Sequence, residues 1–106
     1  MLFINIYNQT NSTMFLFGEW HGTNETPYIF INALKDVIPL NKHINIFLEI
    51  SASMQQILDN YINNQISYKI FRENMILTKG GFDGRESKSF FKIFDFIKDN
   101  KNQITP

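Results

Sequence analysis

Cysteine is absent from the chain, and so is any imbalance of charge. Without cysteine there is neither a disulfide framework nor a thiolate for catalysis. Ten Lys and Arg residues offset ten Asp and Glu residues, which leaves a formal net charge of +0, and the basic residues are scattered. A chain without a basic stripe has no electrostatic footprint for nucleic acid or for an anionic membrane, so we expect neither partner.

Long apolar runs and targeting signals are absent as well. No run approaches the ~18–20 apolar residues of a membrane helix. Residues 1–12 lack the positive region and the cleavage site of a signal peptide. Together with the lack of cysteine, this fits a cytoplasmic protein, which we therefore expect. A hydrophobic fraction of 43% with 19% charged residues is typical of a globular chain, and 106 residues correspond to one domain.

Two short apolar runs indicate strands of a buried parallel sheet. They are residues 14–17 and residues 45–50. Runs that are apolar on both faces are typical of strands that helices cover on both sides. Between them, over residues 27–38, apolar side chains recur at helical spacing, so the whole stretch is predicted to be a strand–helix–strand unit. Residues 2–7 are a candidate third strand.

Three further helices are expected, over residues 53–62, 68–75 and 83–97, where the helical spacing of apolar side chains returns. No strand is predicted after the last helix. Two or three parallel strands lack the neighbours that the edges of such a sheet need. We therefore expect one α/β domain over residues 1–106, with a small parallel sheet and flanking helices. It would be the front part of a larger α/β domain, or it would self-associate through an open sheet edge.

Polar residues follow both predicted strands. Glu19 and His21 come just after the first strand, Glu25 begins the next helix, and Glu49 lies at the end of the second strand. The carboxyl ends of parallel strands meet at one edge of the sheet, where α/β proteins bind ligands, so these side chains are expected together. Arg85 is expected in a loop that returns toward the same side of the sheet.

Glu49 interrupts an apolar run, and a carboxylate inside a buried strand is costly unless it is paired or binds a metal. His21 or Arg85 is the expected partner. A Glu–His contact fixes the imidazole tautomer and raises its basicity, which predicts that His21 acts as a general base with Glu19 or Glu49. Arg85 would stabilise negative charge on the substrate. As an alternative, Glu19, His21, Glu25 and Glu49 suit a divalent metal.

Ordinary structural roles remain open for several of these residues. Glu25 is favoured in a first helical turn by the helix dipole. Asp83 is a candidate substrate contact and also a candidate N-cap, while Trp20 is either the wall of a substrate pocket or a core residue. His43, the second of the two histidines, precedes a predicted strand and is expected to face solvent.

Three segments together resemble a known superfamily. They are GEWHGTNETP over residues 18–27, FLEI over residues 47–50 and DGRES over residues 83–87. Their order and spacing are similar to those of the erythromycin esterase-like, ChaN-like and TraB/Tiki superfamily. The likeness is greatest to a bacterial subgroup with a GExHGTxExP opening and a later DGR-S segment. It covers residues 14–98, which correspond to the front part of a family domain.

The resemblance implies an α/β fold with a site at the strand ends, where Glu19, His21 and Glu49 take the places of the family's functional carboxylates and histidine. In the esterase branch the histidine is thought to activate water for ester hydrolysis. Similar positions in the TraB/Tiki branch are linked to metal-dependent proteolysis, and the ChaN branch binds haem iron. We therefore expect a hydrolase that acts on an ester or amide of a small-molecule substrate. The alternatives are a metal- or haem-binding module and an inactive remnant.

Overall fold

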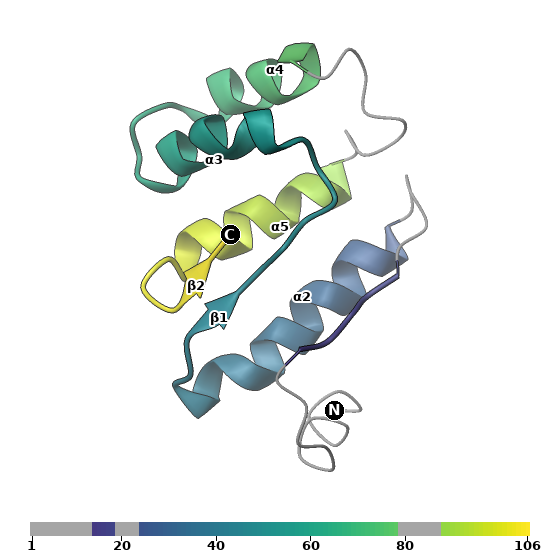
Figure 1. Ribbon diagram of the computed structural model, residues 1–106. Coiled ribbons are helices and arrows are strands. Elements are labelled where there is room, and N and C mark those ends of the chain that lie inside the picture. Colours follow the sequence, from purple (N-terminus) through teal and green to yellow (C-terminus); the bar gives the residue numbers. More distant parts are fainter. Residues whose placement is uncertain (1–13, 19–23, 79–87) are drawn as a thin grey trace.

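The computed structural model of the protein describes residues 14–18, 24–78 and 88–106. In chain order its elements are α2 (Glu25–Val37), η1 (Ile38–Leu40), β1 (Ile44–Asn45), η2 (Ala52–Met54), α3 (Gln55–Ile62), α4 (Tyr68–Thr78), α5 (Lys88–Asp99) and β2 (Ile104–Thr105). Figure 1 shows α5 between α2 on one side and α3 with α4 on the other. The described part is thus a mixed fold, mostly helical, with a small sheet.

The sheet consists of β1 and β2, which pair in parallel with Ile44 opposite Ile104. Backbone hydrogen bonds of 2.8 Å run from the Ile44 N–H to the Gln103 carbonyl and from the Ile46 N–H to the Thr105 carbonyl. The prediction that no strand follows the last helix was therefore wrong. A two-residue strand is too short for a periodic pattern, yet Ile104 is 1% exposed and belongs to the core.

Residues 14–18 are not a strand in the described part of the chain, so the prediction of a buried strand over 14–17 was wrong. Met14 and Leu16 are 72% and 91% exposed. The segment lies along α2 (Figure 1), and the Phe17 ring meets the Phe30 ring edge-on, with centroids 5.2 Å apart. An apolar run becomes a buried strand only where a sheet neighbour is present. Residues 2–7 lie outside the described part.

Only the start of the run over residues 45–50 is a strand. One face of the run is buried, and the other is exposed. Ile46 is 6% exposed, whereas the next residue, Phe47, is 90% exposed. Successive side chains of an extended chain point to opposite sides. One side of this run therefore joins the core, and the other does not. The prediction of a strand that is covered on both faces was therefore wrong for these residues.

The four predicted helices are present, and residues 83–87 of the last one lie outside the described part. α2 has the buried Pro27 in its first turn, where a residue without an N–H loses no helical hydrogen bond. α3 ends before Asn64, which has a φ of 61°, and α4 begins after Ser67, whose hydroxyl accepts a 3.2 Å hydrogen bond from the Ile70 N–H. No helix among the described residues has the length and apolarity needed to cross a membrane.

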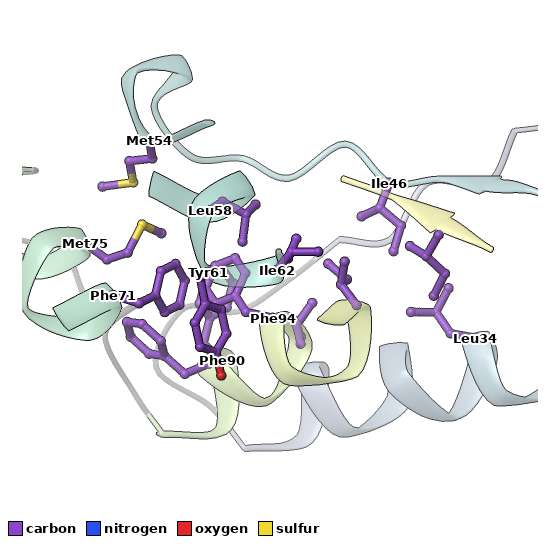
Figure 2. Packing of buried hydrophobic residues seen from close by; sticks show 14 residues of the cluster. Leu34, Ile46, Met54, Leu58, Tyr61, Ile62, Phe71, Met75, Phe90 and Phe94 are labelled. Carbon is purple, nitrogen blue, oxygen red and sulfur yellow. The ribbon is translucent and has the colours of Figure 1, made fainter. Parts of the chain in front are cut away.

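Aromatic rings of α3, α4 and α5 form the centre of the core (Figure 2). Phe71 stacks on Tyr61 with centroids 4.3 Å apart and meets Phe94 edge-on at 5.3 Å. Such ring pairs contribute about 0.5–1.5 kcal/mol beyond the burial of their area. Phe91 and Ile97, also on α5, are 0% exposed. This cluster fixes how the three helices pack.

Replacing Phe94 by alanine tests this core, because the Phe94 ring is 0% exposed. We expect Phe94→Ala to lower the free energy of unfolding by about 3–5 kcal/mol, through lost burial and a cavity. The matched control is Phe47→Ala, at a ring that is 90% exposed, where we expect a change within about 0.5 kcal/mol. Urea titrations followed by circular dichroism measure both. Equal losses would contradict the described packing.

Candidate functional site

The structure describes two of the predicted site residues, Glu25 and Glu49. Five others lie outside the described residues: Glu19, Trp20, His21, Asp83 and Arg85. The described residues on either side of these segments therefore provide the geometry of the candidate site.

Glu25 is the first residue of α2 and is exposed. A carboxylate in a first turn interacts favourably with the partial positive charge at the helix N-terminus. This accounts for Glu25 without a function.

Glu49 follows β1 at a tight turn. The Ile50 N–H donates to the Leu48 carbonyl at 2.9 Å, which makes Glu49 the central residue of a γ-turn. Leu48 and Ile50 are half-buried, whereas Glu49 is exposed. The prediction of a carboxylate inside a buried strand was therefore wrong, and the desolvation cost that demanded a partner does not arise. Glu49 lies four residues beyond Asn45, the last residue of β1.

A hydrogen bond between side chains joins the start of α2 to the start of α5. The Ser89 hydroxyl donates to Oδ1 of Asn24, across 65 positions of the sequence. Asn24 precedes α2, and Ser89 is the second residue of α5. Figure 1 shows both helices starting on the same side of the molecule, toward which the chain leaving β1 also runs. The described ends of the two motif-bearing segments therefore lie together.

His43 is not part of this end of the molecule. Its Nε2 and the hydroxyl Oγ1 of Thr105, on β2, form an exposed hydrogen bond of 2.8 Å. The expectation that His43 faces solvent is confirmed. Across residues 14–18, 24–78 and 88–106, no group of three His, Cys, Asp or Glu side chains is arranged to hold a metal ion.

A second polar group, which the sequence analysis did not predict, lies between α3 and α5. Tyr61 donates a 2.6 Å hydrogen bond to Oδ1 of Asp95, and Nζ of Lys98 lies 4.0 Å from the centroid of the Tyr61 ring. Tyr68 and Asp99 complete the wall of a surface hollow of about 390 Å³. No motif marks these residues, because only the packing of two helices brings them together.

Burial, followed by the hydrogen bond to Asp95, raises the pKa of the Tyr61 phenol well above 10.0. Tyr61 therefore stays neutral and donates throughout the physiological range. This role links two helices and requires no ligand. The raised pKa also gives a test at alkaline pH.

The pH dependence of stability should depend on Tyr61. Its pKa is higher in the folded than in the unfolded chain, so its contribution is complete below about pH 10 and is lost as the pH rises further. We expect the free energy of unfolding of the wild type to fall above about pH 10, and to fall less steeply in Tyr61→Phe. Tyr68→Phe, which keeps the Tyr61–Asp95 bond, is the control. Identical slopes in all three proteins would contradict this account.

No family model, curated protein or solved structure matches this chain in the comparisons with known proteins.

Proposed function

We propose that the protein is a hydrolase of esters or amides, with its site where α2 and α5 begin. The observation that supports this proposal is the hydrogen bond between Asn24 and Ser89. It joins the ends of two segments that carry the chemistry, because His21 lies three residues before Asn24 and Arg85 lies four residues before Ser89. Asn24 and Ser89, 65 positions apart in the sequence, thereby lie together.

In the proposed reaction, neutral His21 accepts a proton from water as the water oxygen bonds to the carbonyl carbon of the substrate, which gives a tetrahedral intermediate. The imidazolium then gives the proton to the leaving oxygen or nitrogen as the C–O or C–N bond breaks, which releases the carboxylic acid and the alcohol or amine. Glu19 or Glu49 holds the imidazole in the required tautomer and stabilises the imidazolium that forms. The guanidinium of Arg85 stabilises the negative charge that develops on the carbonyl oxygen. Trp20 and Asp83 are the proposed substrate contacts. A side chain in any of these roles must be accessible to water and substrate. Glu49 meets this requirement because it is exposed.

We also propose that this α/β unit is the front part of a larger α/β domain, as the family resemblance implies. Two large apolar side chains outside the described helices and strands, Leu16 and Phe47, are 91% and 90% exposed. In a larger sheet, further strands or helices would cover such side chains.

The two histidines of the chain supply a mutant and its matched control. We expect His21→Ala to lower kcat/KM for a p-nitrophenyl ester by about 10²–10⁴-fold, the usual contribution of a general base. His43→Ala, which removes only the exposed bond to Thr105, should keep the wild-type rate.

Other outcomes would reject this mechanism. Equal rates for His21→Ala and the wild type would show that His21 is not the base. Loss of activity on chelation, with recovery on adding a divalent metal, would favour the metal alternative. A new Soret band on adding haemin, without hydrolysis of any ester, would favour the haem-binding alternative.

A further inference from the structure

We propose that a groove along α5 binds a short peptide whose amino and carboxyl ends are both free. The groove consists of two adjoining surface hollows, of about 390 Å³ and about 580 Å³, which share Tyr68 and Asp95 in their walls. Sites for small ligands commonly have volumes of about 300–1,000 Å³. The residues that line the groove come from α3, α4 and α5. The proposal is independent of the proposed hydrolysis of esters or amides.

The two hollows of the groove differ in the sign of their charge. The charged residues of the first are Asp95, Lys98 and Asp99, which are two carboxylates and one ammonium. The charged residues of the second are Arg72, Lys92 and Asp95, which are two cations and one carboxylate. A ligand with an ammonium group at one end and a carboxylate at the other is complementary to this distribution. A ligand of one sign would be repelled by one of the two hollows.

The charges at the two ends of the groove are available to a ligand. Within the described part of the chain, Lys92 and Asp99 take part in no ion pair. Oδ1 of Asp95 accepts a hydrogen bond from Tyr61, and Nζ of Lys98 lies 4.0 Å from the centroid of the Tyr61 ring. Asp99 is the last residue of α5, so the partial negative charge at the C-terminus of a helix adds to its carboxylate. We therefore assign the ammonium end of the ligand to Asp99 and the carboxylate end to Lys92.

The spacing of these charges along α5 sets the length of the ligand. Lys92, Asp95 and Asp99 follow one another at intervals of three and four residues, so they share one face of the helix. The Cα atoms of Lys92 and Asp99 are about 10.5 Å apart along the axis of a regular helix. An extended peptide spans about 3.3–3.6 Å per residue, so three residues cover this distance. A single amino acid carries its two charges too close together to meet both ends.

Tyr68 offers an apolar contact to the middle of the ligand. It lines both hollows and is 40% exposed. Its ring contacts those of Tyr61 and Phe91, with centroids 6.1 Å and 6.3 Å away, and its hydroxyl accepts a 3.3 Å hydrogen bond from Arg72. The exposed part of a ring held in this way is suited to pack against an aromatic side chain. The proposed ligand is thus a tripeptide with an aromatic middle residue.

Titration with the peptide Gly-Phe-Gly tests the proposal. We expect the backbone amide signals of Tyr68, Lys92 and Asp99 to shift along one saturating curve in NMR spectra of the ¹⁵N-labelled protein. The titration is made at about pH 6.5, where both ends of the peptide are charged. An N-acetylated or a C-amidated peptide lacks one exposed charge pair and should bind about threefold more weakly. Free phenylalanine should bind more weakly than the tripeptide.

Charge variants assign each end of the peptide. Asp99→Asn should weaken binding of Gly-Phe-Gly about threefold and leave binding of the N-acetylated peptide unchanged, because that peptide has no ammonium to lose. Lys92→Gln should weaken binding of Gly-Phe-Gly to the same extent and leave the C-amidated peptide unaffected. Glu73→Gln and Lys35→Gln are the matched controls, since both residues are exposed and neither lines the groove. Both controls should bind like the wild type.

Several outcomes would overturn the inference. A site with a Kd of about 1 mM would be nearly saturated at about 10 mM peptide, so unchanged spectra at that concentration would reject it. Shifts confined to α2 would place binding elsewhere. Equal affinity for free phenylalanine would reject the assigned length, and equal losses in the control variants would show a general effect of charge. None of these measurements requires turnover, so failure of the hydrolase proposal would leave the inference standing.

Discussion

Burial of one face of α5 is the interaction on which the rest of the structure depends. Phe91, Phe94 and Ile97 are 0% exposed, and α5 packs against α2 and α3. A helix with such a face cannot remain in water without losing about 1.5–3 kcal/mol for each large apolar side chain. The surrounding helices therefore pack around α5, and the start of α5 provides the reference for the candidate site.

Two polar contacts of α5 differ in their burial and in their structural role. Between α3 and α5, Tyr61 and Asp95 join the helices where the phenol ring is nearly buried. Between α2 and α5, Asn24 and Ser89 join the helix starts at an exposed position. The first contact supports the packing of the core, since an unpaired buried hydroxyl is costly. The second lies where solvent has access.

The sequence predicted the helices well and the sheet poorly, for a physical reason. A helix such as α5 repeats its apolar face over several turns, and this period is visible without knowledge of the neighbours. A short apolar run has no such repeat. Residues 14–17 and 45–50 have similar composition to buried strands, but their burial depends on neighbours elsewhere in the chain. β2, with two residues, carried no pattern at all.

Part of the candidate site was open to prediction, and part was not. The position of Glu49 beyond a strand follows from the chain order, but its exposure follows from a turn that only the structure shows. The pairing of Asn24 with Ser89 joins positions 65 residues apart and has no sequence signal. The central claim is that these two helix starts lie together. Nuclear Overhauser effects between the Asn24 side-chain amide protons and the Ser89 β-protons test it most directly. The account predicts that they are observed; their absence in a fully assigned spectrum would contradict it.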